Sequence, residues 1–169
     1  SLQYIVINIF PLLFFSFKLP AMHLKSEILK EHSKAQTQKI VNWVGSSQER
    51  FDELVTLFLG NEYRVTQRAA WPLAFIAIEY PQLAKKHLTV FVQLLGNETV
   101  HKAVRRNIVR LLQFIEIPKK LHGTIMNHCF EFIADVHETA AIKAFSLTIL
   151  QNLSKQYPEI KQELKTIIE

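Results

Sequence analysis

Apolar residues recur along most of the chain at the spacing of an α-helix. From Leu24 onward they fall at positions i, i+3, i+4 and i+7, as in Phe51, Leu54, Val55 and Phe58. This period places the apolar side chains on one face of each helix, where they can be buried. The sequence therefore predicts an all-α fold. The expected helices form four consecutive hairpins, at residues 24–44 with 47–59, 62–80 with 81–95, 99–117 with 118–135, and 138–157 with 158–168.

The tetrapeptide Leu-Gly-Asn-Glu occurs twice, at Leu59–Glu62 and Leu95–Glu98, 36 residues apart. A recurrence at this distance is typical of arrays of stacked helical repeats. Within the two copies we expect the glycines to end one helix in a left-handed conformation and the asparagines to cap the next. These residues are Gly60 and Gly96, followed by Asn61 and Asn97.

Prolines repeat with nearly the same period as the tetrapeptide. Pro81, Pro118 and Pro158 are separated by 37 and 40 residues, and each is expected to start the second helix of a hairpin. Three leucines inside the preceding helices are spaced by 38 and 39 residues: Leu73, Leu111 and Leu150. The first hairpin is expected to turn at Gly45, with Ser46 and Glu49 forming a capping box at the start of its second helix.

Composition supports a single helical domain in a reducing compartment. The chain has 169 residues, enough for one ordinary domain, and we assign residues 23–169 to it. Only four glycines and six prolines are present, too few for the frequent turns of a many-stranded β protein. Cys129 is the sole cysteine, so no internal disulfide can form. We predict a cytoplasmic protein.

Residues 1–22 form a separate apolar N-terminal segment. Fifteen of the 22 are apolar or aromatic, and the first charge is at Lys18. As a membrane-spanning helix the segment is short and interrupted by Pro11, and as a signal peptide it lacks a basic start. It could also be upstream or added sequence before Met22, or a native element packed on the domain. An exported or membrane-anchored protein is thus the alternative to a cytoplasmic one, with membrane contact only through this segment.

The stretch from Val65 to Pro81 resembles the HEAT-repeat family, also called armadillo-type α-solenoids. It reads Val-Thr-Gln-Arg-Ala-Ala-Trp-Pro-Leu at residues 65–73, followed by Ile76 and then Tyr80-Pro81. A HEAT first helix is similar, with a proline that kinks it, as Pro72 would do here. The resemblance covers residues 24–169 in about four hairpins. It implies a right-handed superhelix whose second helices line a concave face.

Basic residues are concentrated in the third hairpin. Residues 97–122 hold six lysines and arginines against two glutamates, giving +4 of the chain's net charge of +5. Lys102, Arg106 and Arg110 are spaced by four residues and should form one stripe along a helix. The candidate residues for binding an anionic partner are Arg64, Arg68, Lys102, Arg105, Arg106, Arg110, Lys119 and Lys120.

Three interpretations of this basic surface remain open. It is an ordinary solvated face, it binds an acidic protein or peptide, or it binds nucleic acid. We predict a non-catalytic scaffold that binds a protein or peptide partner in the concave groove. The alternative is a nucleic-acid binding module distantly similar to the alkylation-repeat DNA glycosylases, which are also basic HEAT-like solenoids. That family uses tryptophan and an acidic residue against DNA, whereas Trp71 beside Ala69 and Ala70 is interpreted here as a packing residue.

No motif for catalysis, a metal or a cofactor was found. The seven histidines show no pair at i, i+4 spacing, and zinc requires three or four convergent ligands. His122 and Cys129 are two turns apart on one expected helix. Phosphate loops and nucleophile elbows are also missing from the sequence. We therefore expect no enzyme activity, no cofactor and no metal.

Overall fold

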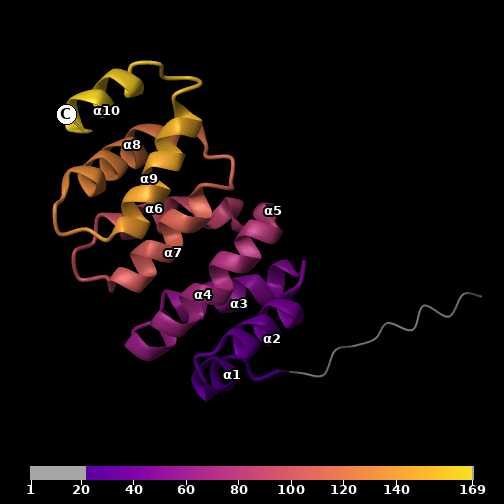
Figure 1. The fold of residues 1–169 in the computed structure, drawn as a ribbon. Coiled ribbons are helices and arrows are strands. Elements are labelled where there is room, and N and C mark those ends of the chain that lie inside the picture. The colour runs from indigo at the N-terminus through magenta and orange to yellow at the C-terminus, as the bar shows by residue number, and fades with distance from the viewer. Residues whose placement is uncertain (1–21, 169) are drawn as a thin grey trace, which may run out of the picture.

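The predicted hairpins stack on one another in chain order, from α1 (Leu24–Lys30) and α2 (Lys34–Val44) at one end to α10 (Ile160–Ile168) at the other (Figure 1). The computed structural model describes residues 22–168, so the segment predicted at residues 1–22 lies outside it, except for Met22. The described part of the chain is helical and contains no strand. Its elements are α1 (Leu24–Lys30), α2 (Lys34–Val44), α3 (Gln48–Phe58), α4 (Tyr63–Glu79), α5 (Pro81–Ala84), the 3-10 turn η1 (Lys85–His87), α6 (Leu88–Leu95), α7 (Lys102–Leu112), α8 (Lys119–Ala134), α9 (Ala140–Leu153) and α10 (Ile160–Ile168).

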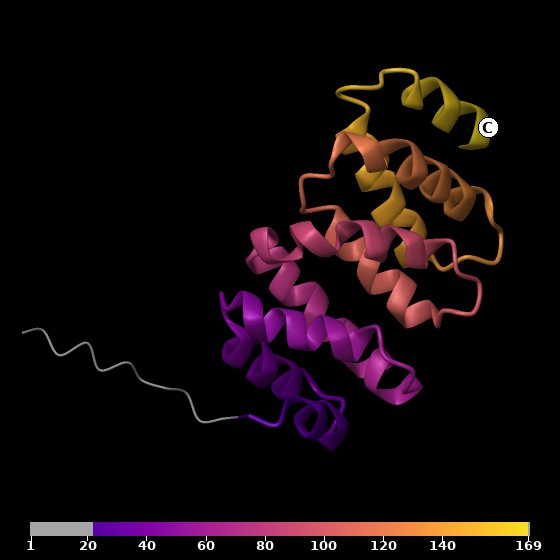
Figure 2. The ribbon, with the colours of Figure 1, turned by 180° about the vertical axis from the view of Figure 1, so that it is seen from behind.

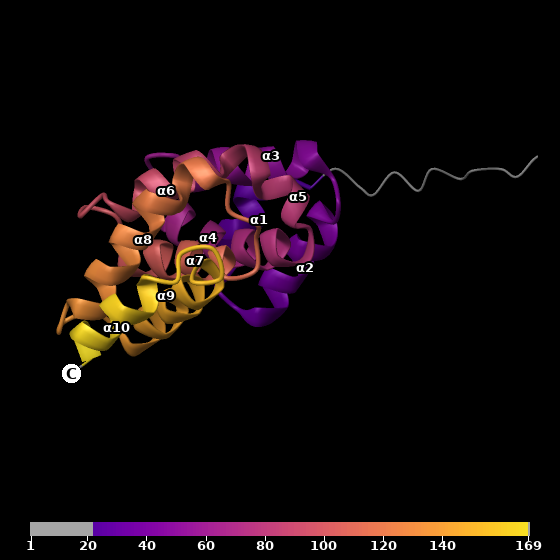
Figure 3. The same ribbon diagram turned by 90° about the horizontal axis from the view of Figure 1, so that it is seen from above.

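The helices form two layers. The first helices of the hairpins pack side by side in the order α2, α4, α7 and α9. The second helices α3, α6, α8 and α10 cover them from one side, through the pairs α3 with α4, α6 with α7, and α8 with α9. The two layers are visible from behind in Figure 2 and from above in Figure 3. The fold is therefore a helical solenoid, as the period of the sequence predicts.

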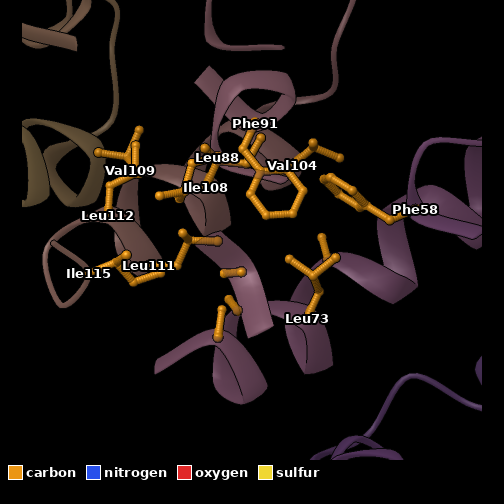
Figure 4. Packing of buried hydrophobic residues seen from close by; sticks show 14 of the residues in the cluster. Phe58, Leu73, Leu88, Phe91, Val104, Ile108, Val109, Leu111, Leu112 and Ile115 are labelled. Carbon is orange, nitrogen blue, oxygen red and sulfur yellow. The ribbon is translucent and has the colours of Figure 1, made fainter. Parts of the chain in front are cut away.

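One apolar core runs between the layers. Phe58 of α3 and Phe91 of α6 meet edge to face, with ring centroids 6.0 Å apart. Figure 4 shows Leu88 and Phe91 of α6 facing Val104 and Ile108 of α7. The buried residues belong to one cluster that extends from Leu24 to Ile160. No hairpin buries its apolar face alone, so stability depends on contacts between neighbouring units.

The first expected helix is broken in two. The sequence predicted one helix over residues 24–44, but α1 ends at Lys30 and α2 starts at Lys34. Glu31 is extended, and the Ser33 hydroxyl accepts a hydrogen bond of 3.0 Å from the Gln36 amide as N-cap of α2. The Gln36 side chain in turn donates to the Glu27 carbonyl at 2.7 Å. These polar contacts replace the helical bonds lost at the break.

The predicted caps are partly wrong. Gly45 does have a positive φ of 50° and ends α2, but the N-cap of α3 is Ser47 rather than Ser46. Gly60 and Gly96 are not left-handed, since Gly45 is the single positive-φ residue among those described. Asn61 and Asn97 do not cap helices either. The N-caps of α4 and α7 are Glu62 and His101, and Asn97 instead accepts from the Thr99 amide at 2.9 Å.

The proline positions follow the prediction more closely. Pro72 lies inside α4 and is buried, and Pro81 is at the first position of α5. Pro118 is the N-cap of α8 rather than its first residue, and α10 starts two residues after Pro158. Within the described chain, no helix combines the length and apolar character needed to cross a bilayer.

Candidate functional site

The basic stripe predicted on the third hairpin lies along α7. Lys102 and Arg106 are exposed, and Arg110 is half-buried. Arg106 and Arg110 line a hollow of about 250 Å³ between α7, α4 and the turn that joins α1 to α2. We call this hollow the arginine groove, and it is lined by His32, Gln67, Trp71, Ala103, Arg106, Asn107 and Arg110.

A row of tilted aromatic rings, formed by His32, Trp71 and Phe75, runs beside the arginine groove. The ring of His32 is 5.5 Å from that of Trp71, which is 6.2 Å from that of Phe75. The guanidinium carbon of Arg110 lies 4.7 Å from the centroid of the Phe75 ring. Such cation–π contacts contribute about 0.5–1 kcal/mol at exposed sites and hold the guanidinium plane in place. Trp71, interpreted from the sequence as a packing residue, is half-buried and lines the groove.

No described carboxylate forms an ion pair with Arg106 or Arg110, although ion pairs occur elsewhere in the described chain, for example between Lys39 and Glu27. The side-chain amide of Asn107 donates to the Ala103 carbonyl of the preceding turn of α7 at 2.8 Å. The groove therefore presents two arginines beside aromatic surface, a combination that can receive carboxylate or phosphate groups.

The two arginines of α4 lie on the same face of that helix but differ in their contacts. Arg64 is exposed. Arg68 reaches back to α1, where its guanidinium donates a hydrogen bond of 2.7 Å to the Leu29 carbonyl. That carbonyl is in the last turn of α1, so Arg68 satisfies an orphan acceptor at a helix end. Arg68 thus helps to dock α1 on α4, close to His32 at the edge of the arginine groove.

Arg105 points into the fold although it is the neighbour of Arg106. Its guanidinium is 3.4 Å from the Glu138 carboxylate, whose side chain is 1% exposed. It also lies over the Phe132 ring, with its guanidinium carbon 5.3 Å from the ring centroid. The second Glu138 oxygen accepts a 2.7 Å hydrogen bond from the Thr139 amide. These contacts join α7 to α8 and to the start of α9, so the Arg105 charge is used inside the protein.

Lys119 and Lys120 are separated from the arginine groove. As expected, both are in the first turn of α8, and both are exposed. Lys119 lines a different hollow of about 400 Å³, together with Lys85 and the buried ring of His122. The Nε2 atom of that ring lies 2.7 Å from the Ile117 carbonyl, and Nδ1 lies 3.1 Å from the Tyr157 hydroxyl. The eight predicted residues thus do not form one continuous surface.

A second hollow adjoins the arginine groove and was not anticipated from the sequence. It has a volume of about 360 Å³, and both hollows are lined by Gln67. We call it the neutral pocket, because no lysine, arginine, aspartate or glutamate lines it. Its lining residues are Phe58, Leu59, Gly60, Asn61, Tyr63, Thr66, Gln67, Leu94, Asn97, Thr99, Val100, His101 and Val104. The repeated tetrapeptide was the signal that could have located it, because one copy contributes to each side.

The family model of the HEAT repeat domain matches residues 24–169. The chain belongs to the HEAT repeat domain family. No curated protein and no solved structure matched the chain. A HEAT repeat domain is a scaffold for protein interaction, which agrees with the open grooves described above.

This HEAT repeat domain shows little that is suited to catalysis in its described residues. No group of three or more histidine, cysteine, aspartate or glutamate residues is placed to hold a metal ion there. Cys129 is buried, and burial raises the pKa of its thiol to about 12, although the nearby Ser146 acts to lower it. A thiol with that pKa is protonated at neutral pH and is a poor nucleophile.

Proposed function

We propose that this HEAT repeat domain is a non-catalytic scaffold whose arginine groove binds an acidic segment of a protein partner. Arg106 and Arg110 are the residues that receive the partner's carboxylates. One observation carries the proposal. Two arginines that form no ion pair with a described carboxylate lie beside an aromatic wall, which consists of His32, Trp71 and Phe75. Family membership supports protein as the class of partner.

Geometry favours carboxylate as the group recognised. A guanidinium binds a carboxylate through two parallel hydrogen bonds, and its planar shape makes this pairing specific. Arg110 is held against Phe75, so less conformational freedom is lost when it binds. Arg106 is exposed and lies one helical turn away on the same side of α7. Two carboxylates about one turn apart along the groove would match this arrangement.

The aromatic wall provides the apolar part of the interaction. Trp71 and His32 lie beside the arginines and can cover the apolar stems of a bound segment. Tryptophan and arginine are the residue types most enriched among energetically dominant interface positions. The groove belongs to the first-helix layer, whereas the resemblance implied that the second helices carry the binding face. We propose that the partner binds between α4 and α7, because the arginines and the aromatic rings lie there.

Charge placement favours an acidic peptide over nucleic acid. Phosphate recognition draws its affinity from many simultaneous contacts with lysine and arginine. Here Arg105 is paired with Glu138, Arg68 bonds to α1, and Lys119 and Lys120 lie on another surface. Two arginines in the groove, with Lys102 on the same stripe, can neutralise only a short anionic segment. That number suits a pair of acidic side chains better than a nucleic-acid backbone.

A selection experiment tests the proposal directly. The full chain is used to select from a random dodecapeptide library, and the enriched peptides are resynthesised with a fluorescent label. We expect enrichment of glutamate and aspartate. We also expect Arg106→Glu to weaken binding at least about tenfold, because one attraction becomes a repulsion. Lys155→Glu is the matched control, since it removes an exposed positive charge far from the groove and changes the net charge equally.

Two results would reject the proposal. One is a peptide set without acidic enrichment, and the other is equal affinity for the Arg106→Glu and Lys155→Glu variants. Labelled duplex and single-stranded oligonucleotides are measured in parallel. If these bind with a log–log salt slope of about −4 to −5 and lose affinity in Arg106→Glu, nucleic acid replaces the acidic segment as the ligand.

A further inference from the structure

The neutral pocket differs in chemistry from the arginine groove that it adjoins. Amide and hydroxyl groups form its rim, through residues such as Asn61, Thr66 and Thr99. Apolar side chains form its interior, including Phe58, which is 1% exposed, and Val104, which is 2% exposed. A concave site with an apolar interior and a few polar groups is the usual form of a pocket that takes one apolar group.

Aromatic rings stand at the mouth of the neutral pocket. Tyr63 is 60% exposed, and its ring meets the ring of His101 edge to face at 5.3 Å. The Nδ1 atom of His101 accepts a hydrogen bond of 3.1 Å from the Ala103 amide, which fixes the ring orientation. A neutral His101 then carries its proton on Nε2. Aromatic rings prefer edge-to-face and offset-stacked neighbours, so this mouth suits another aromatic ring.

Local hydrogen bonds keep the two sides of the neutral pocket in place. The Thr66 hydroxyl donates to the Gly60 carbonyl at 3.1 Å, which ties the first Leu-Gly-Asn-Glu copy to α4. In the second copy, the Asn97 side chain accepts from both the amide and the hydroxyl of Thr99, at 2.9 and 2.7 Å. The pocket is therefore formed before a ligand arrives, which lowers the entropic cost of binding.

We infer that the neutral pocket receives an aromatic side chain of the same acidic segment that binds in the arginine groove. The inference rests on the proposed function, and the two hollows are neighbours because Gln67 lines both of them. It makes the recognised motif bipartite: one aromatic residue for the pocket and acidic residues for Arg106 and Arg110. The carboxylates are assigned to the arginine groove rather than to the neutral pocket, because the pocket lining has no lysine or arginine to pair with a buried carboxylate.

The helix geometry gives the expected spacing in the motif. Val104 lines the neutral pocket and Arg110 the far end of the arginine groove, both on α7. Six residues of helix correspond to about 9 Å, at about 1.5 Å per residue. An extended peptide covers this with about three residues. The aromatic and acidic positions should therefore be separated by about three residues, in either order.

The test uses peptides selected on the full chain, with protein variants that separate the two hollows. Tyr63→Ala removes the ring at the pocket mouth, and Asn61→Phe fills the pocket from a loop. Phe114→Ala is the matched control, because Phe114 is 59% exposed, like Tyr63 at 60%, and does not line the pocket. Circular dichroism and the thermal midpoint establish that each variant is folded.

We expect Tyr63→Ala and Asn61→Phe to weaken peptide binding about tenfold, with Phe114→Ala unchanged. Replacing the aromatic residue of the peptide by alanine should weaken binding to the unmodified protein but hardly affect binding to Tyr63→Ala. If Arg106→Glu abolishes binding while the pocket variants and the peptide's aromatic residue have no effect, this inference is overturned and the proposed function stands. If Arg106→Glu has no effect, the proposed function fails.

Discussion

The guanidinium of Arg110 lies over the ring of Phe75, with 4.7 Å between its carbon and the ring centroid. The contact joins α7 to α4 and orients a positive charge at the edge of the arginine groove. Arg106, one turn earlier, is exposed and makes no such contact. The two arginines of the proposed site should therefore differ in what they contribute to folding.

Charge reversal should separate binding from stability at these two positions. Arg106→Glu should change the free energy of unfolding by less than about 0.5 kcal/mol, as is usual for an exposed side chain. Arg110→Glu should lose about 1 kcal/mol more, because it removes the contact with Phe75. Urea denaturation of both variants measures the difference. Equal stability would show that the Phe75 contact contributes nothing to the fold.

Truncation of Leu111, the α7 member of the regularly spaced leucines, should be strongly destabilising. Leu111 is fully buried, in the core between neighbouring hairpins. Leu111→Ala should cost about 2–5 kcal/mol, from lost burial and the cavity left behind. Leu147→Ala in α9 is the matched control, since Leu147 is 36% exposed. Thermal or chemical unfolding compares the two, and a similar loss in both variants would contradict the stacked core described above.

Acid should weaken the contact between the first two hairpins. Burial pushes the pKa of Asp52 upward, but hydrogen bonds from Lys86, His87 and Gln48 outweigh it and bring the pKa to about 2. Because the folded pKa is below the ordinary value of 3.8, this stabilisation is present above about pH 4 and is lost as pH falls toward 2. Lys86 and His87 belong to η1, so the lost contact is the one between α3 and the second hairpin.

The variant Asp52→Asn checks this pH dependence. Its free energy of unfolding should be lower than that of the unmodified protein at pH 6, and the difference should shrink between about pH 4 and pH 2. Glu49→Gln is a suitable control, because Glu49 is an exposed carboxyl on the same helix. A stability difference that stays constant over this pH range would exclude Asp52 as the titrating group.

The single thiol should react only when the domain opens. Cys129 is 1% exposed on α8, and burial raises its pKa to about 12. Thiolate is the reactive form, so labelling with a disulfide reagent at pH 8 should be much slower in the native protein than in denaturant. The native rate should rise with urea as opening increases. Rapid labelling without denaturant would place the thiol at the surface.

Much of the architecture was predictable because it depends on local rules. The period of the apolar residues and the spacing of the glycines and prolines located every hairpin. Pro72 and Pro81 lie in α4 and α5 as expected. The errors lie at helix ends and at breaks within expected helices. Residues 81–95, expected as one helix, form α5, the 3-10 turn η1 and α6. The break after Lys30 and the capping by Ser47 rather than Ser46 depend on a few competing hydrogen bonds. Several serines and asparagines near a helix end can each form such bonds at similar cost.

The sequence by itself determined that the chain is a HEAT-like array and that its positive charge is concentrated around α7. Only the tertiary structure decided which of these charges share a surface. Arg105 and Arg106 are adjacent in the chain, but consecutive residues are about 100° apart around a helix. Arg105 consequently meets Glu138 and Phe132, while Arg106 faces the arginine groove. Which helix face a neighbour covers depends on how the hairpins stack, and that is set by the summed packing of distant residues.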